Sequence, residues 1–134
     1  MALAAALPKQ SFSLKELKLS RMCGTFGFDA GMEILKSISH LTSLEVLELK
    51  HNHFGWYDGR CIVLSTSLTQ LTSLKQLHIQ NNNMDDDTGV QIVNALSKLQ
   101  NLEHIYLSAN SFGEKTAAAL LETLPKWKNL TPWT

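Results

Sequence analysis

The chain has 134 residues, which is the size of one domain. Twelve basic and twelve acidic side chains give a formal net charge of zero, so the basic excess that nucleic-acid and anionic-membrane binders need is absent. No apolar run approaches the roughly 20 residues that a membrane span requires. The composition therefore predicts no nucleic-acid partner and no membrane partner. Its one unusual feature is its 23 leucines.

The N-terminal residues do not match a secretory signal. The apolar stretch Leu3–Leu7 has no basic residues before it and is shorter than the roughly 7–15 residues of such signals. We expect a short helix there that ends near Pro8, so that residues 1–13 form an N-terminal capping helix or partial repeat. Two cysteines, Cys23 and Cys61, are too few for a disulfide framework. These features predict a cytoplasmic protein.

The leucines fall on a repeat. Four segments follow the pattern L-x-x-L-x-L, with isoleucine at some positions, and they begin at Leu14, Leu44, Leu74 and Leu102, which are 30, 30 and 28 residues apart. One further step of 28 residues reaches Leu130. The spacing predicts four repeats and a partial fifth strand, with the bounds 14–43, 44–73, 74–101, 102–129 and 130–134.

Each repeat contains the elements of one structural unit. The leucine pattern predicts a short strand, and three units carry an asparagine three residues after it, at Asn52, Asn82 and Asn110. Apolar residues also lie ten, six and three residues before each pattern, which is the spacing of one helix face. One unit of strand, turn and helix cannot bury its own apolar face, so we expect the units to stack.

This pattern resembles the leucine-rich repeat family, most closely the long subtype, roughly 28 residues per repeat, of ribonuclease inhibitor and the NOD-like receptors. The resemblance covers Leu14 to Trp133. It implies one α/β domain over residues 1–134, a right-handed solenoid shaped as a horseshoe arc. A parallel β-sheet would line the concave face and helices the convex face, with about four full repeats plus partial terminal units. In this family the asparagine side chains bond backbone groups along the turn.

Two units depart from the pattern. In the first, Met22 occupies the asparagine position, two extra residues precede the helix, and Cys23 takes the asparagine's role through a bulge if the unit follows the family. The second unit also has two extra residues, within Gly55–Arg60, and we expect this loop to protrude between strand and helix. It contains Trp56 and Tyr57, for which packing against the helix edges and exposure as a recognition patch are equally open.

The residues between the leucines are candidates for contact with a partner. Side chains alternate along a strand, so these residues face the open side of the sheet. The predicted contact residues are Glu48, Lys50, His78, Gln80, His104 and Tyr106 in the strands, and Trp56 and Tyr57 in the inserted loop. Tyr106, His78 and His104 are the preferred anchors, because aromatic side chains dominate interface hot spots. The alternative is that the surface only solvates the sheet.

Histidines on the same side raise the possibility of a metal site. The diagonal through His51, His78 and His104 separates neighbours by roughly 8–11 Å, whereas zinc ligands lie about 2.1 Å from the ion. The sequence therefore predicts no metal site. It also lacks a Ser-His-Asp spacing, an H-E-x-x-H motif and a phosphate-binding glycine loop, which predicts no cofactor and no enzymatic activity.

The run Asp85–Asp87 superficially resembles a calcium loop. Counted from Asn81, however, the twelfth position holds Ile92 rather than a bidentate glutamate. We expect these carboxylates to cap a helix that starts near Thr88 and to complement its positive end.

These observations predict a non-catalytic protein–protein interaction module. It would present the concave sheet and the adjoining strand-to-helix loops to a protein partner of unknown identity. The isolated chain would be a monomer or associate weakly through its uncapped ends. The resemblance also implies two alternatives: a regulatory or ligand-sensing segment of a larger NOD-like-receptor-type signalling protein, or a GTPase-activating regulator, whose relatives are longer and carry an acidic tail.

Overall fold

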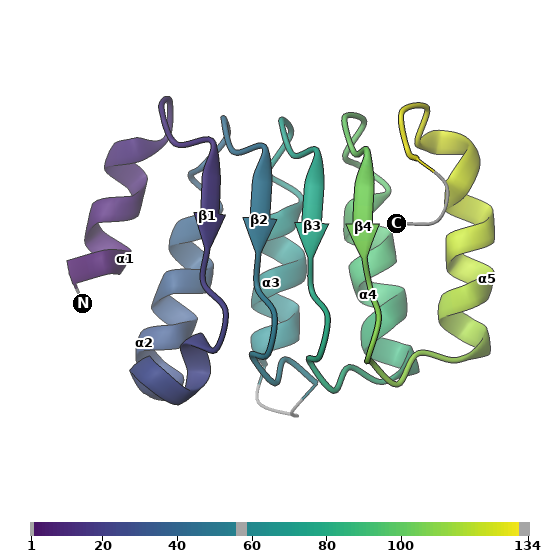
Figure 1. Ribbon diagram of the computed structural model, residues 1–134, viewed down its shortest axis with the longest axis horizontal. Helices are drawn as coiled ribbons and strands as arrows, with labels where there is room; N and C mark the ends of the chain where they lie inside the picture. The colour runs from purple at the N-terminus through teal and green to yellow at the C-terminus, as the bar shows by residue number, and fades with distance from the viewer. Residues whose placement is uncertain (1, 56–58, 132–134) are drawn as a thin grey trace.

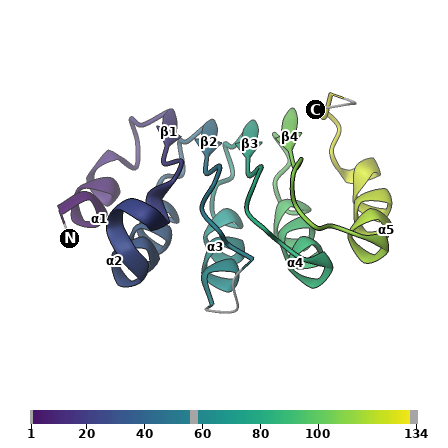
Figure 2. The same cartoon turned by 60° about the horizontal axis from the view of Figure 1, so that its bottom comes forward.

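The computed structural model describes residues 2–55 and 59–131, without the side chains of residues 2 and 23–26. Figure 1 shows four strands side by side, and Figure 2 shows them as one layer with the helices as a second. The predicted α/β class with a parallel sheet is confirmed. In chain order the elements are α1 (Ala2–Ala6), the 3-10 helix η1 (Leu7–Gln10), β1 (Glu16–Lys18), α2 (Met22–Ile38), β2 (Val46–Glu48), α3 (Arg60–Leu68), β3 (Gln76–His78), α4 (Asp86–Leu96), β4 (His104–Tyr106), α5 (Glu114–Thr123) and the 3-10 helix η2 (Leu124–Lys126).

The sheet has the order β1-β2-β3-β4, and all neighbours are parallel. Its register follows the sequence repeat, so that equivalent residues of successive units lie side by side. Leu47, for example, is paired with Leu77, and His78 with Tyr106. The 30- and 28-residue spacings are therefore one strand step each.

The repeated apolar residues form the core. In the two central units the leucine pattern is fully buried, at Leu44, Leu47, Leu49, Leu74, Leu77 and Ile79. The helix positions of α2, α3 and α4 are buried too, as predicted. The last unit differs: the side chain of Leu124 is 44% exposed, so its predicted burial is wrong. The physical reason is that none of the described residues covers this side of α5.

A ladder of asparagines ties the turns together. The Asn82 Nδ2 donates to the carbonyls of Leu49 and Ile79 at 3.0 and 2.9 Å, and its Oδ1 accepts the N–H of Asn52 at 2.7 Å. Asn52 and Asn110 make equivalent bonds one unit to either side. Because these groups are buried, each bond replaces one that the backbone would otherwise make with water. The predicted role of the asparagines is confirmed.

The first turn is built differently from the prediction. Buried Met22 begins α2, and its N–H donates to Asn52 Oδ1 at 2.6 Å. The expected extra residues form a helical turn that ends at a kink at Gly27, where φ is 77°. Glycine adopts this left-handed φ at no steric cost, which explains the residue at the kink. The Cys23 side chain is outside the described part, so its expected role is not placed.

The two ends continue the pattern in part. At the N-terminus the α-helix ends at Ala6, but Pro8 lies within η1 instead of ending the helical segment. At the other end the Thr131 N–H donates to the Glu103 carbonyl at 2.7 Å, as the Glu103 N–H does to the Lys75 carbonyl at 2.8 Å. Residues 132–134 of the expected fifth strand lie outside the described residues.

Candidate functional site

The uncovered face of the sheet holds the predicted strand contacts. Helices pack on one face only (Figure 2), and the middle residue of β2, β3 and β4 points into that core. The flanking residues are half-buried on the other face, which no described helix covers. The strands bring all six predicted residues to this face. Together with Gln76 they form what we call the sheet surface: Glu48, Lys50, Gln76, His78, Gln80, His104 and Tyr106.

Three aromatic rings stack on the sheet surface. His78 and Tyr106 are register partners, and their ring centroids lie 4.2 Å apart with an interplanar angle of 14°. The ring of His104 lies 6.3 Å from that of Tyr106, at 24°. Aromatic pairs at such spacings stabilise one another beyond the area they bury. The result is a nearly flat aromatic platform across β3 and β4.

The His78 ring is neutral at physiological pH. Burial lowers the pKa of its imidazole below the ordinary value of 6.5, and the Lys50 and Lys18 cations lower it further against the opposing effect of Glu48. His104 adds a smaller lowering effect. A neutral imidazole has one donor and one acceptor nitrogen, so the platform can offer either to a partner.

Charges on the sheet surface lie towards β1 and β2 and are paired. Glu48 Oε1 accepts from the Ser20 hydroxyl at 3.0 Å and lies 3.7 Å from Lys50 Nζ. The other half of the surface, over β3 and β4, is neutral and aromatic. This is the change from charged to neutral strands that the sequence predicts. Ser20 was not among the predicted contacts, although strand alternation places it on the same face.

Two buried polar atoms of the sheet surface have no hydrogen-bond partner among the described residues: Gln80 Oε1 and His104 Nδ1. A buried polar atom left without a partner costs about 1–3 kcal/mol. A bound molecule that brings a donor to the Gln80 amide after a side-chain rotation would recover part of this energy. These atoms therefore mark the β3–β4 half as the more reactive part of the surface.

The remaining predicted contacts are not placed on the surface. Trp56 and Tyr57 lie outside the described residues, so neither of their two expected positions is decided. The eighth position of the repeat, which includes His51, does not extend the open face as expected. Its residues are left-handed, with φ between 55° and 60° at Arg21, His51, Asn81 and Ala109, and they turn the chain away from the strands.

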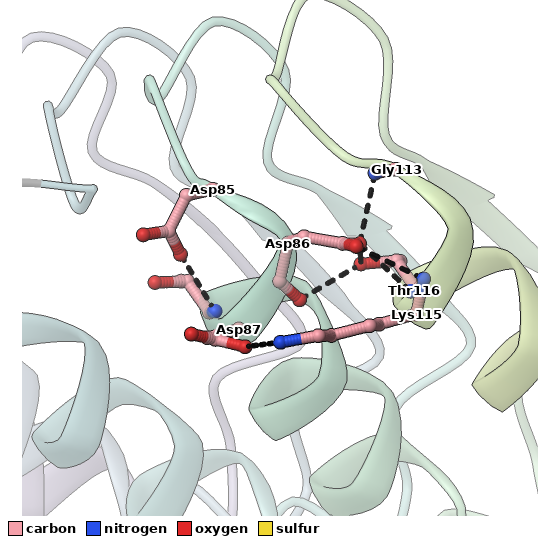
Figure 3. A network of polar contacts seen from close by, with 7 residues as sticks. Asp85, Asp86, Asp87, Gly113, Lys115 and Thr116 are labelled. Carbon is pink, nitrogen blue, oxygen red and sulfur yellow. Dashed lines mark hydrogen bonds and ion pairs between the residues drawn. The ribbon is translucent and has the colours of Figure 1, made fainter.

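The aspartate run links two helices (Figure 3). Asp85 Oδ1 accepts the Thr88 N–H at 2.8 Å and caps α4, as predicted, although the helix already begins at Asp86. Asp86 instead caps the next helix, α5. Its carboxylate accepts the N–H groups of Gly113 and Thr116, both at 2.8 Å, and the Thr116 hydroxyl at 2.6 Å. The sequence did not predict this contact between units.

The hydrogen bonds from Thr116, first its hydroxyl and then its backbone, hold the pKa of Asp86 far below the ordinary value of 3.8. Asp86→Ala should therefore lower the melting temperature by several degrees, because three N–H groups at the start of α5 lose their acceptor. Asp87→Ala is the matched control. It removes only the exposed ion pair with Lys115, 2.9 Å long, and should change the melting temperature by about one degree or less.

The advantage of Asp86 depends on pH in a defined direction. A carboxylate whose pKa is lower in the folded than in the unfolded chain stabilises the fold above the unfolded value. The difference in melting temperature between the wild type and Asp86→Ala should be constant from pH 7 to about pH 5 and shrink as the pH falls below 3.8. Thermal unfolding in a pH series checks this, and a difference that grows in acid would contradict it.

Other chemistry was sought in the same residues. In the ranges 2–55 and 59–131, no three His, Cys, Asp or Glu side chains gather where they could hold a metal ion. Cys61 is buried, and burial raises the pKa of its thiol, which keeps it protonated. The described helices include none that is both long and apolar enough to cross a membrane. The sheet surface remains the candidate site.

The fold defines an α/β domain of stacked strand-and-helix units. No family model and no curated protein matches the sequence. Among solved structures, the chain is similar to leiomodin-1 actin-binding site 2, with a TM-score of 0.77 and 12% identity over 96% of this chain and 74% of that one. It is also similar to the tropomodulin C-terminal domain of Caenorhabditis elegans, with a TM-score of 0.80 and 12% identity over 96% and 77%. The chain thus shares the fold of these domains.

These similarities correct the family assignment. The resemblance to ribonuclease inhibitor and the NOD-like receptors is wrong, since the structural matches are to leiomodin and tropomodulin domains. The alternative of a NOD-like-receptor segment loses its support with it. The physical reason is that leucine spacing reports what fills the core between stacked units. Proteins with the same stacking share that spacing, so it does not separate one family from another.

Proposed function

We propose that this chain is a non-catalytic protein-interaction module whose contact surface is the sheet surface, with the adjoining strand-to-helix loops at its edge. The observation that carries the proposal is the stacked pair of His78 and Tyr106 on a sheet face that no described helix covers. Aromatic side chains at the centre of a surface supply most of the energy of many protein interfaces.

The way these side chains are held supports the proposal. They are half-buried and stacked, so they lose little conformational freedom when a partner arrives. The ion pair between Glu48 and Lys50 is already formed within the surface, and the His78 ring carries no charge to desolvate. A partner with a polar and aromatic contact surface, and no strong excess of charge, fits this arrangement best.

Actin is the first partner to test. The leiomodin-1 domain with the same fold is named as an actin-binding site. At 12% identity the likeness concerns the fold, so the contact residues of that domain are not transferred to this chain. We propose that actin, if bound, contacts the sheet surface of this chain.

Two finer features belong to the same proposal. The chain would be a short right-handed solenoid of the leucine-rich repeat type, an arc of about four units, which the recurring strand register and asparagine ladder support. It would act in the cytoplasm, which the small number of cysteines supports. A protein partner, with no nucleic acid or membrane, fits the balanced charge.

Tyr106→Ala should weaken binding to actin by about tenfold or more, because it removes the central ring of the platform. Ile62→Ala is the matched control. Ile62 is 62% exposed on α3 in the helix layer, and its truncation should leave the affinity unchanged. Co-sedimentation with filamentous actin and fluorescence titration with monomeric actin measure both. Equal weakening by the two substitutions would contradict the assignment of the sheet surface, and no binding of the wild type would exclude actin.

A further inference from the structure

The outer side of α5 carries exposed apolar side chains. This helix is the last in the row (Figures 1 and 2). The side chain of Leu121 is 70% exposed and that of Leu124 44%, and Ala117 beside them is exposed as well. Neighbouring large apolar side chains on one helix face are unfavourable in water and mark a contact surface.

The same positions form an interface one unit earlier. Val93 and Leu96 of α4 are 1% and 0% exposed because α5 packs on that side, and a side chain at Gly89 would clash with Thr116. Asp86 bonds the first turn of α5 from the same side. The four positions of α4 and their equivalents in α5, 28 residues later, are Asp86 and Glu114, Gly89 and Ala117, Val93 and Leu121, and Leu96 and Leu124.

The charges on this face suit an antiparallel copy of itself. Exposed Glu114 begins α5, and the other end carries one acidic residue, Glu122, and two basic ones, Lys126 and Lys128, all exposed. Lys115, near the acidic end, is already paired with Asp87 at 2.9 Å. Two antiparallel helices of this kind bring the negative end of one against the positive end of the other, and their dipoles also oppose.

We propose that the outer side of α5 is a tail-to-tail interface between two copies of this chain, related by a two-fold axis near Leu121. A closed pair of this kind buries the same apolar patch on both subunits. The opposite end of the molecule offers no matching surface. Its exposed residues on α1 and η1 are Ala5, Ala6, Lys9 and Gln10, which are small or polar.

Analytical ultracentrifugation of the whole chain from about 1 µM to about 1 mM tests the proposal. The wild type should pass reversibly from monomer to dimer, and Leu121→Glu should stay monomeric over the same range. Ile62→Glu is the matched control, because it places the same charge at a similarly exposed apolar residue of α3, and it should dimerise like the wild type. A monomeric wild type, or equal loss of the dimer in both variants, would overturn the interface.

Charge reversal tests the orientation of the two helices. Glu114→Lys should weaken the dimer by about three- to tenfold, and adding Lys126→Glu to it should restore the wild-type association. Failure of the double variant to recover would overturn the antiparallel pairing, and growth beyond a dimer would show head-to-tail stacking instead. Tyr106→Ala should leave dimerisation unchanged, so this test is independent of the function proposed for the sheet surface.

Discussion

Phe54→Ala should lower the free energy of unfolding by about 4 kcal/mol. Phe54 is fully buried in the turn between β2 and α3, where it follows Asn52 by two residues. Removing the ring forfeits its transfer free energy and leaves a cavity in a core that contacts units on both sides. Domains of this size are stable by about 5–15 kcal/mol, so the loss is a large part of the total.

Urea unfolding followed by far-ultraviolet circular dichroism and by tryptophan fluorescence measures this change. Phe12→Ala makes the same chemical change at a side chain that is 89% exposed, and it should alter stability by about 0.5 kcal/mol or less. The two probes must give coincident transitions, because stacked units can unfold in steps. Similar losses for Phe54→Ala and Phe12→Ala would contradict the core described above.

Asn82→Ala should lower the free energy of unfolding by about 3 kcal/mol. The side chain is fully buried, and its removal leaves the Asn52 N–H without the acceptor that it holds at 2.7 Å. The carbonyls of Leu49 and Ile79 lose donors as well, although Asn110 still donates to the second. Each buried group left unpaired costs about 1–3 kcal/mol.

The matched control is Asn94→Ala, at an exposed position of α4. It should change stability by about 0.5 kcal/mol or less, since alanine favours the helix slightly. Hydrogen exchange gives a second measurement: in Asn82→Ala the Asn52 amide should exchange much faster, whereas in Asn94→Ala it should not. An unchanged exchange rate at Asn52 in Asn82→Ala would contradict the ladder.

The strands and the core could be predicted because they depend on repeated apolar residues. The spacing of Leu44, Leu74 and Leu102 equals one step across the parallel sheet, and asparagine after each strand has one place where both ends of its amide find backbone partners. The bounds of the first helix could not be predicted. Gly27 allows a kink that joins a helical turn to α2, and a single glycine does not announce its φ.

The candidate site could be predicted as a set of residues but not as a geometry. Strand alternation places His78, His104 and Tyr106 on one face, and this much follows from the sequence. The stacking of the His78 and Tyr106 rings depends on side-chain rotamers and on the depth at which each ring sits. The bond from the α5 backbone to Asp86 was missed for a related reason, since it joins units 28 residues apart through one rotamer.

The proposed role of the sheet surface is tested most directly by nuclear magnetic resonance of the isotope-labelled chain while actin is added. Amide signals of β3 and β4, from His78 and Gln80 to Tyr106, should shift or broaden first, while those of α3 and α4 change only with the slower tumbling of the complex. Changes confined to the helix layer would contradict the assignment of the sheet surface, and the absence of any change would contradict actin as the partner.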